Sequence, residues 1–164
     1  MRYFVPLLLT LSAGIASAQP AAIVVQEYTY APVGIAAGTT LRLNVANITN
    51  GGTTACTGNL SYVNSDGTTI KAADFTANPG QTSSYPLLIT DVTGSPASAE
   101  VRGVVKINRQ VGGVVGQPIA PSCSAVMSLE IVDIATGQTR AVLTSPTPIT
   151  GGFAIPLPVV GTAQ

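Results

Sequence analysis

The sequence predicts an all-β fold, an antiparallel β-sandwich of about eight strands with one disulfide. Three observations predict it. Apolar and polar residues alternate with a period of two in several segments. Residues that favour turns separate these segments at short intervals. Threonine and valine are abundant, and glycine or proline interrupts nearly every window that could form a helix, so we expect no helix beyond the N-terminal segment.

Residues 1–18 have the features of a secretory signal peptide. Arg2 gives the positive start, an apolar run follows from Val5 to Leu11, and Ala16-Ser17-Ala18 forms a small-residue cleavage site. The alternative is a membrane anchor, but the run is shorter than the about 20 apolar residues that a spanning helix needs. We therefore expect cleavage after Ala18, no membrane span, and a secreted, periplasmic or cell-surface protein.

Residues 19–145 contain the segments that alternate and are predicted to form one sandwich domain. Within each segment, every second residue faces the core. The inward rows are Leu41, Leu43 and Val45; Cys56, Gly58, Leu60 and Tyr62; Tyr85, Leu87 and Ile89; Val101, Val105 and Ile107; and Cys123, Ala125, Met127, Leu129 and Ile131. Residues 138–144 return after the last of these rows. Turns are expected at residues 64–67, 78–81 and 135–137.

Both cysteines, Cys56 and Cys123, fall on inward-facing positions. Export places them in an oxidising compartment, where two cysteines most simply form one intramolecular disulfide. The alternative is a pair of free thiols or a bridge between chains. The sequence therefore predicts one covalent link across the core.

Two short segments carry a resemblance to known proteins. Ala31-Pro32-Val33-Gly34, continuing to Leu41-Arg42-Leu43-Asn44-Val45, resembles the entry strands of small secreted bacterial Ig-like β-sandwich proteins. The turn Pro79-Gly80-Gln81 before a strand is similar to one common in them. The resemblance implies an Ig-like sandwich and no defined activity. True immunoglobulin domains pack a core tryptophan against their disulfide, and this chain has no tryptophan.

The composition argues against several classes of function. Seven basic and seven acidic residues balance to a net charge of zero, and histidine is absent. Histidine-dependent hydrolysis and histidine-ligated zinc are therefore excluded, and no positive field exists to bind nucleic acid. The carboxylates are scattered, and Glu130 and Asp133 point to opposite faces of a strand, unlike a glycosidase pair. We expect no catalytic residue, no metal and no cofactor.

The uncharged segment 111–121 is one candidate interaction surface. It joins two predicted core strands and carries Val114, Val115 and Ile119. An apolar loop on a secreted protein is suited to contact a partner. The alternative, which stays open, is that the loop folds back over one end of the sandwich.

The second candidate is the Pro/Gly-rich tail, residues 146–164. Here Phe153, Ile155, Leu157 and Val159 alternate with Ala154, Pro156 and Pro158. The two prolines remove N–H groups along one side only, which predicts an edge strand that pairs on its other side. Such a strand either caps its own domain or pairs with a neighbouring molecule as a donor strand.

These observations favour a secreted, non-catalytic structural or interaction protein, a self-assembling surface or extracellular subunit that acts through strand addition. Its expected partner is another copy, giving a homo-oligomer, or another secreted protein. The alternative is a small ligand- or glycan-binding module. The main basic cluster, Arg102, Lys106 and Arg109, is either a weak anion site or a solvated face, and Tyr28 with Tyr30 is either a sugar platform or packing.

Overall fold

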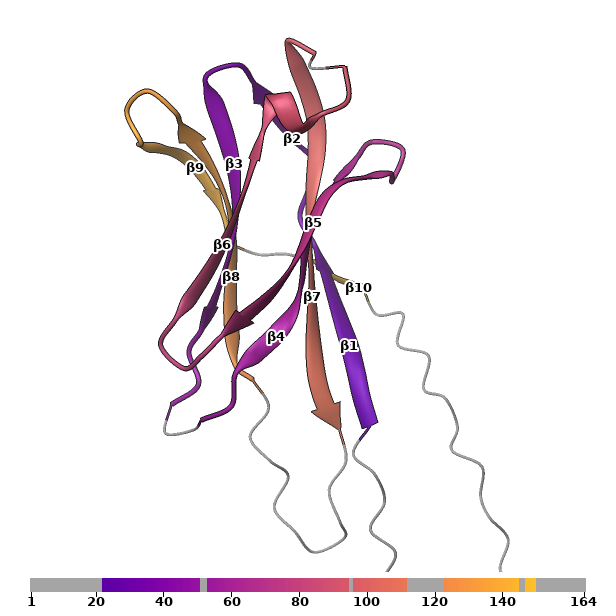
Figure 1. The fold of residues 1–164 in the computed structure, drawn as a ribbon, viewed down its shortest axis with the longest axis vertical. Helices are drawn as coiled ribbons and strands as arrows, with labels where there is room; N and C mark the ends of the chain where they lie inside the picture. Colours follow the sequence, from indigo (N-terminus) through magenta and orange to yellow (C-terminus); the bar gives the residue numbers. More distant parts are fainter. Residues whose placement is uncertain (1–21, 51–52, 95, 112–122, 145–146, 150–164) are drawn as a thin grey trace, which may run out of the picture.

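The structure, a computed structural model, describes residues 22–50, 53–94, 96–111, 123–144 and 147–149. These residues form two β-sheets that face each other as a sandwich (Figure 1). All strand pairs are antiparallel. The described part of the chain contains no α-helix, only the short 3₁₀ turn Ile89–Asp91. The predicted all-β, antiparallel fold is confirmed.

The larger sheet has six strands and the smaller one has four. The order in the larger sheet is β10 (Thr147–Ile149), β1 (Ala22–Thr29), β7 (Ser98–Val111), β4 (Cys56–Asn64) and β5 (Thr69–Ala77), and β2 (Val33–Ala36) also pairs with β7. The order in the smaller sheet is β6 (Thr82–Leu88), β3 (Thr39–Asn47), β8 (Ala125–Asp133) and β9 (Thr139–Leu143). The ten strands of the described residues exceed the expected eight or so, because short strands such as β10 give no periodic signal of their own.

The core lies between the two sheets and is built from the predicted inward rows. In β3, Leu41, Leu43 and Val45 are fully buried. Leu129 lies beside Leu43 on the neighbouring strand β8, and Val105 of β7 belongs to the same core cluster from the other sheet. The predicted turns also occur, since glycines at positions 67, 80 and 137 have positive φ. Positive φ favours glycine, which explains why these turns need it.

The predicted disulfide between Cys56 and Cys123 is present and joins the two sheets. Cys56 begins β4 of the larger sheet, and Cys123 lies two residues before β8 of the smaller one. Their Cα atoms are 5.1 Å apart, and both side chains are buried. The bond closes a loop of 67 positions, for which the chain-entropy model gives a stabilisation of up to roughly 4 kcal/mol.

Tyr62 provides a second link between the sheets. It belongs to β4, yet its hydroxyl lies between Leu43 of β3 and Tyr85 of β6, which are partners in the smaller sheet. The hydroxyl accepts the N–H of Leu43 at 2.9 Å and donates to the carbonyl of Tyr85 at 2.6 Å. Burial raises the pKa of Tyr62, which keeps the donating proton in place.

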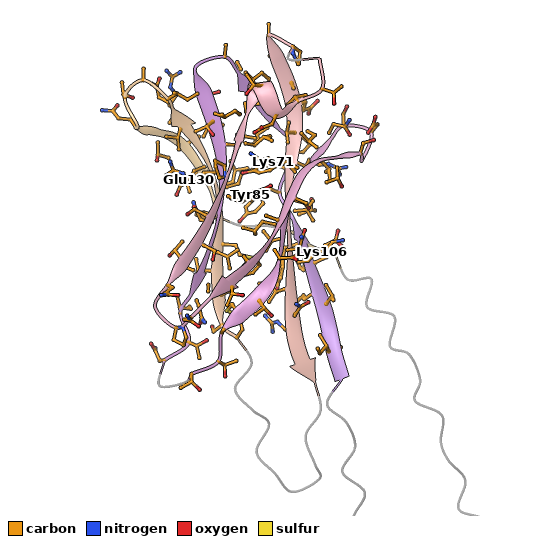
Figure 2. All side chains as sticks on the ribbon, in the orientation of Figure 1. Lys71, Tyr85, Lys106 and Glu130 are labelled. Carbon is orange, nitrogen blue, oxygen red and sulfur yellow. A yellow bond between two sulfur atoms is a disulfide. The ribbon has the colours of Figure 1, made fainter. Side chains whose placement is uncertain are left out.

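Lys71 closes the side of the sandwich where β5 and β6 meet. Its Nζ lies 2.9 Å from Oδ2 of Asp91 and donates to the carbonyl of Pro86 at 3.1 Å. The same Nζ lies 5.4 Å from the centre of the Tyr85 ring, and Figure 2 shows both residues between the sheets. The hydrogen bond from the N–H of Leu88, and then the contact with Lys71, lower the pKa of Asp91, so this carboxylate stays ionised at neutral pH.

Candidate functional site

The N-terminal part of β1 has an open side. On one side, β1 pairs with β7 along its whole length. On the other side it pairs with β10, and only at Glu27, Tyr28 and Thr29. No other described strand pairs with Ala22–Gln26, which we call the β1 edge. Figure 1 shows the lower end of β1 projecting below β10.

Three successive side chains of the β1 edge are exposed and apolar. The exposed fractions are 66% for Ile23, 44% for Val24 and 53% for Val25. Side chains alternate between the two faces of a strand, so both faces of the β1 edge present apolar surface. An added strand could therefore bury apolar surface on either face.

The backbone of the β1 edge also presents N–H and carbonyl groups that have no partner strand among the described residues. The N–H of Tyr30 donates to the carbonyl of Gly103 in β7 at 2.9 Å, and backbone direction alternates along a strand. Even-numbered residues of β1 therefore point their N–H groups at β7, and odd-numbered residues point theirs away. Pro148, which has no N–H, lies opposite even-numbered Tyr28, as this parity requires. The N–H groups of Ile23 and Val25 consequently face the open side.

The other described outer edges carry features that discourage strand pairing. Charged residues and prolines on an edge strand oppose pairing with another chain. Lys71 lies on β5, Pro86 on β6, Arg140 on β9 and Pro148 on β10. Two stretches are exceptions and carry neither feature, namely β2 and residues 125–128 of β8, which β9 does not reach, but each has only four residues. Among the described strands, the β1 edge is thus the longest open stretch without a charge or a proline.

The outer face of the larger sheet holds a polar depression of about 310 Å³. Ser61 and Val104 form its floor, since both face outward and are nevertheless buried. Lys106, labelled in Figure 2, pairs with Glu27 at 3.3 Å on one side. Arg102 borders the other side. Strand parity places Arg102 and Lys106 on this one face, as expected from the sequence.

Arg109 does not belong with these two basic residues. It has odd parity and lies on the inner face of β7, where its Nη2 donates to the hydroxyl of Tyr28 at 3.4 Å. The predicted cluster of three is therefore wrong, because residues 102 and 109 face opposite sides of one strand. Tyr30 is buried in the core, and burial raises its pKa, so the Tyr28 and Tyr30 pair is packing and not a platform.

The seven residues predicted to make contacts all lie outside the described residues. They are Val114, Val115, Ile119, Phe153, Ile155, Leu157 and Val159. The signal peptide, residues 1–18, and most of the predicted tail, residues 146–164, also lie outside them. From the sequence, residues 23–30 could be considered only as an alternative donor strand, because their alternation is poorer than that of the tail. Their role as an acceptor edge was missed. The available signal was three apolar residues in succession, Ile23-Val24-Val25, with no charge among them.

Two of the carboxylates serve local turns. Asp66 accepts the N–H of Thr68. Hydrogen bonding to the side chain of Thr68, and then to this N–H, lowers the pKa of Asp66. Asp133 accepts the N–H of Thr136 and pairs with Arg140, and both contacts lower its pKa. Within the described ranges, no three His, Cys, Asp or Glu residues come together as a metal site would require. The described residues also include no helix able to cross a membrane.

Compared with protein-family models, with curated proteins and with solved structures, the chain matches none of them.

Proposed function

We propose that the protein is a non-catalytic structural or interaction protein that assembles by strand addition, with the β1 edge as the acceptor. The observation that carries the proposal is the β1 edge itself. It is apolar and uncharged, and no described strand covers it, whereas the rest of β1 on the same side is paired with β10. The disulfide, together with the lack of a spanning helix in the described residues, is compatible with the extracellular or periplasmic location that we propose.

Strand addition uses both features of the β1 edge. An incoming strand pairs its backbone with the outward groups of Ile23 and Val25, which gives affinity. Its side chains cover the exposed apolar surface of the same residues, which removes that surface from water. Both gains require an acceptor free of charge, since a lysine on an edge would have to lose its hydration on pairing.

The substitution Val25→Lys is expected to weaken self-association at least about tenfold, equivalent to about 1.4 kcal/mol. The ammonium group would be placed where the added strand packs. The measurement is the average mass by analytical ultracentrifugation over a range of protein concentrations. For the wild type we expect this mass to rise with concentration, and for the variant to rise only at concentrations at least about ten times higher.

Val142→Lys is the matched control. The exposed fraction of Val142, 51%, is similar to the 53% of Val25. Val142 lies instead on β9, whose edge already carries Arg140. This variant should assemble like the wild type. A wild type that stays monomeric at every concentration, or a Val25→Lys variant that assembles normally, contradicts the proposal.

A second candidate function is binding of an anionic sugar on the outer face of the larger sheet. Arg102 borders the depression described above and a second one of about 290 Å³ lined by Pro32, Ser65, Glu100 and Val101. Arg102 is half-buried, and its side chain makes no hydrogen bond or ion pair with the residues that the structure describes. A guanidinium group in this state favours a carboxylate, which it binds through two parallel hydrogen bonds.

The test is a chemical-shift titration of the protein with D-glucuronate and, separately, with D-glucose. Binding of glucuronate at millimolar concentration and no binding of glucose are expected. Arg102→Gln should weaken glucuronate binding about tenfold or more, as loss of a charged hydrogen bond does. Arg42→Gln is the control, because Arg42 lies on the other sheet beside Glu130. Wild-type affinity in Arg102→Gln, or no glucuronate binding by the wild type, rules this function out.

A further inference from the structure

We infer that the strand added to the β1 edge is residues 153–159 of a second copy of this chain. The inference rests on the proposed function and names the partner. Three features carry it: the point at which β10 ends, the glycines that follow β10, and the parity of the prolines in the tail.

The last described residue of the chain lies at the boundary of the β1 edge. Ile149 pairs with Glu27, so β10 ends beside the first residue past that edge. Residues 150–164 follow it in the sequence and contain no charged residue. Every molecule therefore carries an uncharged segment, with the apolar row of Phe153, Ile155, Leu157 and Val159, close to its own acceptor.

The register of β10 argues against the chain covering its own β1 edge. In this antiparallel pair, each residue forward along β10 lies opposite the preceding residue of β1. Extending β10 beyond Ile149 in the same register would therefore place Gly151 opposite Val25 and Gly152 opposite Val24. Glycine has no side chain to cover these valines and weakens a strand. Two successive glycines suit a change of chain direction, and the inference assigns them this role.

The prolines of the tail match the acceptor in parity. Pro148 occupies an even position in β10, where its missing N–H would point away from β1. Pro156 and Pro158 are also even-numbered, so a strand that pairs its odd residues with Ile23 and Val25 directs both prolines outward. Its odd residues Phe153, Ile155 and Leu157 then lie on the face of Ile23 and Val25 and cover them.

This pairing joins two different surfaces, a tail on one copy and an edge on the next. Such a head-to-tail contact generates rings or open chains of copies. Each copy then donates once and accepts once. The outward prolines end the sheet at the added strand, because a further strand would meet positions without N–H groups.

Proline substitutions in the full chain test this inference. Ile155→Pro removes an N–H that faces the acceptor, so we expect self-association to fall at least about tenfold, as for loss of a buried hydrogen bond with its packing. Ala154→Pro is the matched control, because it adds a proline of the same parity as Pro156 and Pro158. That variant should assemble like the wild type.

Mixing two defective variants gives the decisive result. Val25→Lys blocks the acceptor and leaves the tail intact, and Ile155→Pro blocks the tail and leaves the acceptor intact. Each alone should be monomeric, and an equimolar mixture should form a 1:1 dimer by analytical ultracentrifugation. A mixture that stays monomeric overturns the inference, and is the result expected if each tail covers its own edge.

The outcomes separate this inference from the proposed function. If Val25→Lys abolishes assembly and Ile155→Pro assembles normally, strand addition stands and the tail is not the donor. If the purified wild type is monomeric at every concentration, both the inference and the proposed self-assembly are contradicted. The same result would be observed if only another secreted protein fills the edge.

Discussion

Replacing Gly58 with alanine is expected to destabilise the protein by about 3 kcal/mol or more, at the upper end of the range for overpacking. A Cβ atom at this position would lie 1.8 Å from the carbonyl oxygen of Lys106 and 2.9 Å from the ring of Phe75. The carbonyl belongs to the backbone of β7, which pairs with β4. It cannot move away without disrupting the centre of the larger sheet.

Gly34→Ala is the matched control for this prediction. Gly34 also lies in a strand, but a Cβ atom there would meet nothing within 4 Å. Because alanine loses less backbone entropy on folding, this variant should be stabilised by roughly 0.5–1 kcal/mol. The free energy of unfolding is measured by urea denaturation at a concentration where the protein is monomeric. Similar values for the two variants would show that the space around Gly58 is not limiting.

Tyr62→Phe should lower the free energy of unfolding by about 2–6 kcal/mol, since two buried polar groups lose a partner and each such loss costs about 1–3 kcal/mol. The substitution keeps the ring but removes the oxygen that joins Leu43 to Tyr85. The N–H of Leu43 and the carbonyl of Tyr85 would each lose this hydroxyl as a hydrogen-bond partner. Urea denaturation measures this loss as well.

Tyr30→Phe provides the comparison, because Tyr30 is also buried but its hydroxyl has no hydrogen-bond partner among the described residues. Removing that hydroxyl removes an unsatisfied polar group, so stability should be unchanged or higher. If both substitutions lower stability equally, the hydroxyl of Tyr62 does not link the sheets as described.

Much of the fold could be predicted from local sequence pattern. β3 and β8 alternate over most of their length and carry large apolar residues at inward positions, so their faces and the turn at Gly137 could be assigned directly. The disulfide followed from the same parity. Parity also separates Arg109 from Arg102, and applying it strictly would have prevented the error about the basic cluster.

Contacts between distant strands could not be predicted in this way. The role of Tyr62 depends on where β4 packs against the paired strands β3 and β6. The need for glycine at position 58 depends on how closely β7 approaches β4. The β1 edge depends on where β10 ends, and β10 has only three residues. Each feature is a property of strand neighbours, and these are set by the whole topology rather than by local alternation.

Hydrogen exchange of single backbone amides in β1 tests the central claim most directly. The N–H groups of Ile23 and Val25 face the open side, and that of Val24 faces β7, so Val24 is an internal reference. We predict that the amides of Ile23 and Val25 exchange rapidly in dilute protein and slowly in concentrated protein, while that of Val24 stays protected in both. Exchange of Ile23 and Val25 at one rate across all concentrations, whether fast or slow, would contradict strand addition at this edge.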